Sequence, residues 1–210
     1  MVISFVTDGK LTDIAEETDA VFIAPDFLGE VSYERERANM SKLCLAAKYS
    51  AACSVVFGAV TVLGAVRRRS AVVAQKGKLV TIADEVYADG KDGFAGGTLP
   101  QTLDTPHGKI GIAVAGDMLA PGLLQYFADA GCDVVCAMLW HTDEMTEVLA
   151  RAIAYMYGYH IAVCAPGVCF CAEPTGTTLT GRTVKPVFSY GYREQKRRVR
   201  TGGKKSRADG

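Results

Sequence analysis

Four polar residues each follow an apolar segment of the chain and could carry out chemistry if those segments are strands: Asp26, Glu85, Asp117 and His141. Three carboxylates and one imidazole can hold a divalent metal ion, and a bound metal ion can activate water for hydrolysis. The simpler interpretation is that they are ordinary polar groups where a pocket opens to solvent. We favour this second interpretation and expect neither a metal ion nor another cofactor.

The chain contains seven cysteines, an odd number that cannot pair completely. Cys136 and Cys164 lie inside apolar segments, where a free cysteine behaves as a small hydrophobic residue. The spacings of Cys132 and Cys136, and of Cys169 and Cys171, differ from those of common zinc sites, so core filling is the favoured interpretation. Cys169 and Cys171 are also candidates for a nucleophile, but no basic residue adjoins them in sequence to activate a thiol.

The elements that must position these residues alternate between short apolar segments, which predict strands, and amphipathic segments, which predict helices. The predicted strands are Val2–Val6, Ala20–Ala24, Ser54–Leu63, Ala71–Gln75, Leu79–Ile82, Lys109–Val114, Asp133–Leu139 and His160–Ala165. The predicted helices are Tyr33–Tyr49, Pro121–Ala130 and Asp143–Tyr157. Arg67–Arg69 are predicted to form a basic turn between two strands, and Asp84–Thr102 a long, glycine-rich surface loop.

This alternation predicts an α/β layered protein whose strands are buried on both faces. Ligand sites in such folds form at the carboxyl ends of strands. The residues expected at those ends are Asp26, the loop after Ile82, Ala115–Asp117, Trp140–His141 and the segment from Pro166 onward.

Five segments occur in an informative order: Phe22–Phe27, Gly77–Tyr87, Thr105–Leu123, Gly131–Trp140 and Ala150–Ile153. Together they resemble segments of the nitrilase (carbon–nitrogen hydrolase) superfamily. The third is the most informative, because in that family a Gly-Lys-Ile-Gly strand leads into Cys-Tyr-Asp and then into a Pro-Glu-Leu helix start. Here Gly-Lys-Ile-Gly is followed by Ala-Gly-Asp and by Pro-Gly-Leu.

The resemblance implies a catalytic triad whose three positions are all changed. The family uses a Glu as general base, a Lys to stabilise charge and a Cys nucleophile, and the matching residues here are Asp26, Glu85 and Ala115. An alanine cannot form an acyl intermediate, and a carboxylate would repel a developing oxyanion. Three supporting positions differ as well, because the family's Tyr, Arg and Glu are replaced by Gly116, Leu119 and Gly122.

Composition and charge place the chain among globular proteins and separate its C-terminal end from the rest. Of its 210 residues 49% are hydrophobic and 22% charged, and no apolar run is long enough to cross a bilayer. Met1–Lys10 lacks the features of a secretory signal, so a cytoplasmic location is expected. From Arg193 to Gly210 eight basic residues face two acidic ones. We predict that residues 191–210 form a solvated, disordered tail; a contact with an acidic partner is the alternative, and binding to nucleic acid is not expected.

The resemblance implies a four-layer α–β–β–α sandwich over residues 1–190, with shortened N- and C-terminal parts. It also implies a homodimer, whose contact Tyr155, Tyr157 and Tyr159 could extend. The expected function is that of a pseudoenzyme with a ligand-binding, regulatory or scaffold role. The alternative is a carbon–nitrogen hydrolase (amidase) that cleaves a small amide by chemistry that does not use a cysteine, for example with the help of a metal ion. The predicted binding residues are Asp26, Glu85, Ala115, Gly116, Asp117, Trp140 and His141.

Overall fold

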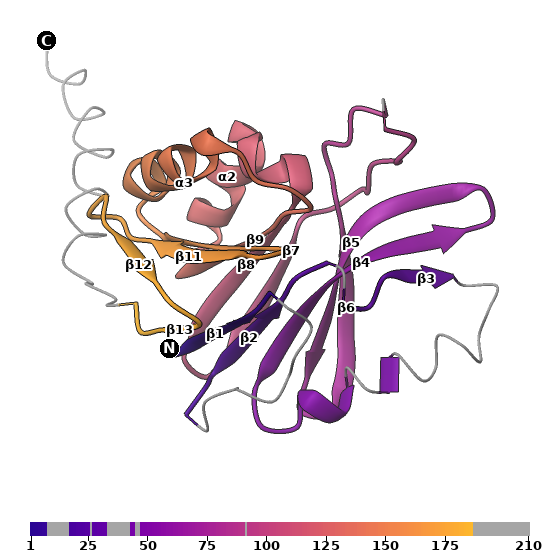
Figure 1. Cartoon of the computed structure of the whole chain (residues 1–210), viewed down its shortest axis with the longest axis horizontal. Helices are drawn as coiled ribbons and strands as arrows, with labels where there is room; N and C mark the ends of the chain where they lie inside the picture. The colour runs from indigo at the N-terminus through magenta and orange to yellow at the C-terminus, as the bar shows by residue number, and fades with distance from the viewer. Residues whose placement is uncertain (8–16, 26, 33–42, 45–46, 91, 187–210) are drawn as a thin grey trace, which may run out of the picture.

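The computed structural model describes residues 1–7, 17–25, 27–32, 43–44, 47–90 and 92–186. Within them the chain forms two mixed β-sheets with two α-helices beside one of them, which is an α/β fold (Figure 1). No helix of this described part is long and apolar enough to cross a membrane. The cytoplasmic location stays a prediction.

The first sheet contains the N-terminal strands and has the order β13-β1-β2-β4-β5-β6, with β3 paired to β4. The pairs β1–β2, β2–β4 and β3–β4 are parallel, and the others are antiparallel. Its strands are β1 (Ile3–Val6), β2 (Ala20–Ile23), β3 (Glu30–Ser32), β4 (Ser54–Leu63), β5 (Val66–Gln75), β6 (Lys78–Asp84) and β13 (Thr183–Val184).

The second sheet has the order β12-β11-β10-β9-β8-β7, with parallel pairs β8–β9 and β9–β10. Its strands are β7 (Gln101–Thr105), β8 (Gly108–Val114), β9 (Val134–Met138), β10 (His160–Ala165), β11 (Val168–Ala172) and β12 (Thr178–Thr180). The helical elements η2 (Ala115–Leu119), α2 (Pro121–Asp129) and α3 (Glu144–Tyr157) belong to this half of the chain.

The core lies between the two sheets because alternate residues of the central strands point to opposite faces. In β2, Phe22 faces the second sheet, whereas Val21 and Ile23 face the opposite side. In β9, Cys136 faces the first sheet and Val135 packs under α2 and α3. The central strands are therefore buried on both faces, as predicted.

The outer face of the first sheet is also apolar and buried, and Leu43 packs against it. The predicted helix Tyr33–Tyr49 would cover this face, but most of it lies outside the described residues; residues 43–44 and 47–49 are helical. The fourth layer therefore stays a prediction. The shortened N- and C-terminal parts and the disordered tail at 191–210 also stay predictions, because residues 8–16 and 187–210 lie outside the described residues.

The predicted strands of both sheets and the two predicted helices beside the second sheet are confirmed. β4 and β10 have the predicted bounds. The prediction of a turn at Arg67–Arg69 is wrong, because these residues lie within β5 and the turn is at Gly64, where φ is +59°. The three arginines pair with Val60, Thr61 and Val62 of β4. This cross-strand pairing, which the local sequence does not show, overrides the turn-like composition.

The predicted loop Asp84–Thr102 is confirmed only in its central part. Asp84 ends β6 and Gln101 begins β7, so the loop runs over residues 85–100. The short strands β3, β11, β12 and β13 were not predicted, because strands of two to five residues carry too little periodicity to be recognised.

Candidate functional site

A cavity of about 320 Å³ lies where β6, β8 and β9 end. Glu85 comes from the loop after β6, Ala115 and Gly116 from the turn after β8, and Trp140 and His141 from the segment after β9. These five predicted residues are thus brought together. Asp26, the sixth position of interest, lies outside the described residues.

Ala115 forms a sharp turn between a strand and a helix. β8 ends at Val114, Ala115 has φ +48°, and the chain then enters η2 and α2. Left-handed backbone is uncommon for a residue with a side chain, and such strained strand-to-helix turns present a nucleophile in other hydrolase folds. This turn places a methyl group where the resemblance puts the nucleophile.

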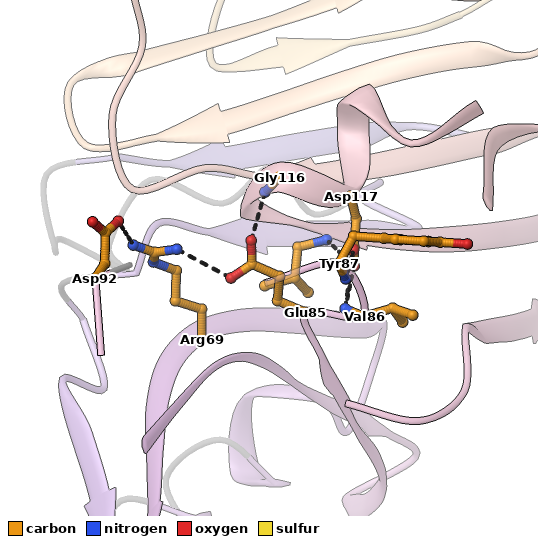
Figure 2. A network of polar contacts seen from close by, with 8 residues as sticks. Arg69, Glu85, Val86, Tyr87, Asp92, Gly116 and Asp117 are labelled. Atoms are coloured by element: carbon orange, nitrogen blue, oxygen red, sulfur yellow. Dashed lines mark hydrogen bonds and ion pairs between the residues drawn. The ribbon is translucent and has the colours of Figure 1, made fainter. Parts of the chain in front are cut away.

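Glu85 occupies the position beside this turn with a buried carboxylate that is 2% exposed. Its Oε1 accepts a hydrogen bond of 2.9 Å from the backbone N–H of Gly116, the residue after the turn (Figure 2). The backbone N–H after a nucleophile is a common donor to a developing oxyanion. In this structure the Gly116 N–H donates instead to the carboxylate of Glu85.

Arg69 neutralises the charge of Glu85. Its Nη1 lies 3.1 Å from Oε2 of Glu85, and its Nη2 lies 2.7 Å from Oδ2 of Asp92 (Figure 2). The guanidinium also lies over the ring of Phe94, 4.4 Å from the ring centroid. Burial alone would lower the pKa of Arg69, but its hydrogen bonds to Asp92 and Glu85 raise it, so Arg69 remains charged.

The backbone of Glu85 is fixed as well. Its N–H donates to the carbonyl oxygen of Arg69 at 2.9 Å, and its carbonyl oxygen accepts from the N–H of Gly97 at 2.6 Å. The backbone that carries this carboxylate is therefore held from both the strand side and the loop side.

Asp117 does not line the cavity, although it was predicted as a binding residue. It is buried, and its carboxylate accepts backbone N–H groups of Val86 and Tyr87 at 2.9–3.1 Å, with a longer contact from Val114 (Figure 2). Burial raises its pKa, and these hydrogen bonds offset part of the rise. Asp117 anchors the loop that carries Glu85.

Two of the four proposed metal ligands are engaged elsewhere. Both Glu85 and Asp117 use their oxygens on the partners just described, and the part of the chain that the structure describes contains no group of three or more His, Cys, Asp or Glu residues arranged to hold a metal ion. A contribution from Asp26 lies outside that part, so the metal hypothesis gains no support from the described residues.

Neither cysteine proposed as a relocated nucleophile lines the cavity. Burial raises the pKa of Cys169, with Arg182 acting in the opposite direction, and burial raises the pKa of Cys171 to about 12. Cys136 and Cys164 are buried in the core with raised pKa values, as core filling requires. A thiol with a raised pKa is a poor nucleophile at neutral pH.

A second, smaller cavity of about 100 Å³ contains a cysteine together with a histidine and a carboxylate. His107 Nε2 lies 3.0 Å from Oδ1 of Asp19, and Cys53 lines the same cavity. Burial and the nearby Asp19 raise the pKa of the Cys53 thiol, which is the opposite of activation. His160 is buried in β10.

Several residues of the main cavity were not among the predicted binding residues, although three of them lie in the loop after Ile82: Arg69, Tyr87, Asp89, Asp92, Met118, Leu119, Leu139, Asp143, Thr146 and Leu149. Of these, Arg69 had a usable signal, since it is one of three consecutive arginines in a valine-rich region. Asp143 is the N-cap of α3, where the hydroxyl of Thr146 lowers its pKa.

No protein-family model and no curated protein matches this sequence. Solved structures do match. A cysteine-to-alanine mutant of the Nesterenkonia AN1 amidase from the nitrilase superfamily aligns over 97% of this chain and 96% of its own, with 20% identity and a TM-score of 0.71. In another mutant of that amidase, the acetamide moiety of fluoroacetamide is covalently added at the active site cysteine.

Two further solved structures also match the fold of this chain. Nit3 of Saccharomyces cerevisiae, a member of branch 10 of the nitrilase superfamily, covers 92% of this chain and 84% of its own, with 16% identity and a TM-score of 0.66. The glutamine-dependent NAD+ synthetase from Acinetobacter baumannii covers 85% of this chain, which spans 40% of the synthetase, with 14% identity and a TM-score of 0.65. The chain therefore has the α/β fold with two mixed sheets of nitrilase-superfamily amidases over nearly its whole length.

Proposed function

We propose that this protein is a nitrilase-like pseudoenzyme that has lost thiol-dependent hydrolysis and keeps its pocket for a ligand-binding, regulatory or scaffold role. The observation that carries the proposal is that Ala115 and Glu85 occur together at this site. The turn has the backbone of a nucleophile position without a nucleophile, and the adjacent N–H is already bonded to a carboxylate.

Two consequences for chemistry support this proposal. An acyl-enzyme needs a side chain that can attack a carbonyl carbon, and the methyl group of Ala115 cannot do so. A tetrahedral intermediate needs donors and positive charge at its oxygen, and the carboxylate of Glu85 presents the opposite charge. Arg69 supplies positive charge nearby, but both of its terminal nitrogens already contact carboxylates.

The test is to restore the three positions together, with Asp26→Glu, Glu85→Lys and Ala115→Cys, and to expose the protein to fluoroacetamide. The thiolate would displace fluoride, forming an S–C bond, and peptide mapping would locate the adduct. Ala115→Cys alone should react slowly, because the neighbouring Glu85 carboxylate raises the pKa of a thiol. Exposed Cys44 is the internal reference for an unactivated thiol.

If position 115 in the triple variant reacts faster than Cys44 and the variant releases ammonia from small amides, only the catalytic residues have been lost. If position 115 in the triple variant reacts no faster than Cys44, the pocket has lost its shape as well, and a scaffold role is favoured over ligand binding. Ammonia release by the unaltered protein would contradict the proposal.

The proposal includes a homodimer and a four-layer sandwich over residues 1–190, followed by a tail at 191–210. Large apolar side chains are exposed on η2, α2 and α3, where a second copy could cover them: Leu119, Tyr126, Met145, Val148, Tyr155 and Met156. Of the three tyrosines predicted near this contact, Tyr155 is exposed, whereas Tyr159 is buried and donates its hydroxyl to the carbonyl oxygen of Leu124. Tyr157 stacks on Tyr159, so Tyr155 is the tyrosine best placed for the contact.

A further inference from the structure

Two cysteines on neighbouring strands lie opposite each other beside a tight turn. β10 and β11 are joined by the two-residue turn 166–167, and Ala165 pairs with Val168 beside it. The next pair in the register is Cys164 and Cys169. In a hairpin of this kind the pair beside the turn exchanges two N–H···O bonds, so the Cα atoms of the next pair lie about 4.5 Å apart. A disulfide needs Cα atoms about 4.4–6.8 Å apart, so the backbone already allows one here.

The two thiols also point to the same side of the sheet. Cys164 belongs to the core between the sheets, and Cys169 packs against that core. Burial raises the pKa of the Cys164 thiol, and the nearby thiols of Cys136 and Cys169 raise it further. Cys164 donates to the carbonyl oxygen of Phe22 at 3.4 Å, and Cys169 donates to that of Gly181 at 3.7 Å. A thiol is a weak donor, so these contacts do little to hold the two sulfur atoms apart.

No other two cysteines in the described strands lie directly opposite each other. Cys136 of β9 and Cys171 of β11 both lie opposite Ala162 of β10. Cys169 and Cys171 are two residues apart on one strand, so their β-carbons stand about 6–7 Å apart, whereas a disulfide needs about 3.5–4.5 Å. The register therefore selects Cys164 and Cys169 from the seven cysteines.

Cys169 is the more accessible of the two residues. It is half-buried, whereas Cys164 is buried. Burial raises the pKa of Cys169, and the charge of Arg182 acts in the opposite direction. We propose that Cys164 and Cys169 form a reversible disulfide when the protein meets a hydroperoxide, and that this bond locks the hairpin of β10 and β11. The inference goes beyond the proposed function and does not depend on ligand binding.

The reaction has two steps. The Cys169 thiolate attacks one oxygen of the hydroperoxide: an S–O bond forms, the O–O bond breaks, and the alcohol (water, for hydrogen peroxide) leaves with the thiol proton. The Cys164 thiol then attacks the sulfenic sulfur: an S–S bond forms, the S–O bond breaks, and water leaves with its proton. The two thiols lose two electrons to the hydroperoxide, and an added dithiol returns them. Because burial keeps both thiols largely protonated, the first step is slow and responds to sustained oxidation.

The hairpin contacts the ends of strands in both sheets. The backbone N–H of Leu139, a residue that lines the main cavity, donates to the carbonyl oxygen of Cys164 at 3.0 Å. In the turn, the N–H of Gly167 donates to the carbonyl oxygen of Thr7, the residue after β1, at 3.3 Å. A bond between Cys164 and Cys169 would therefore stiffen a segment that connects the two sheets beside the cavity.

The test is differential labelling after incubation of the unaltered protein with hydrogen peroxide. Free thiols are blocked with N-ethylmaleimide in urea, the protein is reduced with dithiothreitol, and newly freed thiols are labelled with iodoacetamide. Fragment-ion mass spectrometry then identifies the label on each cysteine. We expect the second label on Cys164 and Cys169 together, and its loss when dithiothreitol precedes the blocking step. The oxidised protein should unfold about 4–8 °C higher than the reduced protein, because closing a short loop restricts the unfolded chain.

Cys171→Ala is the matched control, since Cys171 lies on the same strand and against the same core but opposite Ala162. This variant should form the disulfide as the unaltered protein does, whereas Cys169→Ala should leave Cys164 without the second label. A second label on neither residue, on Cys169 without Cys164, or on Cys169 together with Cys171 would overturn the pairing. An unchanged unfolding temperature in the oxidised protein would overturn the lock.

Discussion

Ala115 holds a backbone conformation that suits glycine better than alanine. A left-handed residue with a β-carbon costs on the order of 1 kcal/mol, which the surrounding strand and helix must offset.

Ala115→Gly should therefore leave the free energy of unfolding unchanged or raise it by up to about 1 kcal/mol, because relief of strain offsets the entropy of glycine. Ala113→Gly is the control: Ala113 is buried in β8 and has no positive φ, so its loss should cost about 1 kcal/mol or more. Urea unfolding measures both. Equal losses in the two variants would show that the turn at Ala115 is not strained.

Glu85 and Gly116 fit each other closely. A β-carbon on Gly116 would lie 2.9 Å from Oε1 of Glu85, so the hydrogen bond between them needs glycine at this position. The two differences from the family pattern at these positions are therefore physically linked: the carboxylate could not approach as closely beside a larger residue.

A double-mutant cycle tests this link. Gly116→Ala should lower the free energy of unfolding by about 1–3 kcal/mol in the unaltered protein, because the methyl group displaces a buried, paired carboxylate. In a Glu85→Ala background the same change should cost at least about 1 kcal/mol less. Additive losses in the cycle would mean that Gly116 is needed for another reason.

At the residue scale the sequence predicted much of the site. Five of its seven proposed residues line the cavity, because residues that follow neighbouring strands converge in such folds. Asp117 follows β8 as predicted but does not line the cavity, since whether a carboxylate turns toward a cavity or toward backbone N–H groups depends on loop geometry. Arg69 and Asp92 were missed for a related reason: they are 23 residues apart and meet only through tertiary contact.

At the scale of elements, the strands and helices nearest the site were predictable from periodicity. The bounds of β8, β9, α2 and α3 agree with the predicted bounds to within one residue at each end. Gly158 ends α3 with φ +78°. Glycines inside elements were not interpretable from the sequence, because their role depends on what a β-carbon would meet.

Two glycines should respond to alanine in opposite directions. In β4 a β-carbon on Gly58 would lie 2.5 Å from Cα of Pro25, so Gly58→Ala should cost about 2–3 kcal/mol of unfolding free energy. In α2 a β-carbon on Gly122 would meet only the hydroxyl oxygen of Tyr87 at 3.5 Å, and Gly122→Ala should stabilise by about 0.5–1 kcal/mol. Thermal and urea unfolding would measure both; a neutral Gly58→Ala would contradict the packing of β4 against Pro25.

At the scale of the whole molecule, the two sheets share one core, and each contributes strand ends to the cavity. The sequence could not show which outer faces stay uncovered, since exposure depends on the assembled surface.

The exposed apolar side chains of α2 and α3 predict the oligomeric state. Val148→Glu should convert a dimer into a monomer, because it places a charge in the centre of the proposed contact. Leu79→Glu on β6, which is also an exposed apolar position, should leave the dimer intact. Sedimentation equilibrium measures both variants. If the unaltered protein is a monomer, the proposed dimer is wrong.

The central claim is that the unaltered protein does not hydrolyse amides, and the direct measurement is ammonia release from a panel of small amides. The assay is run on the unaltered protein, with and without added divalent metal ions. The account predicts no release above the uncatalysed rate under either condition, because Ala115 cannot attack and Glu85 fills the adjacent N–H donor. Saturable release would contradict it, and release that needs the metal ion would establish the metal-assisted amidase instead.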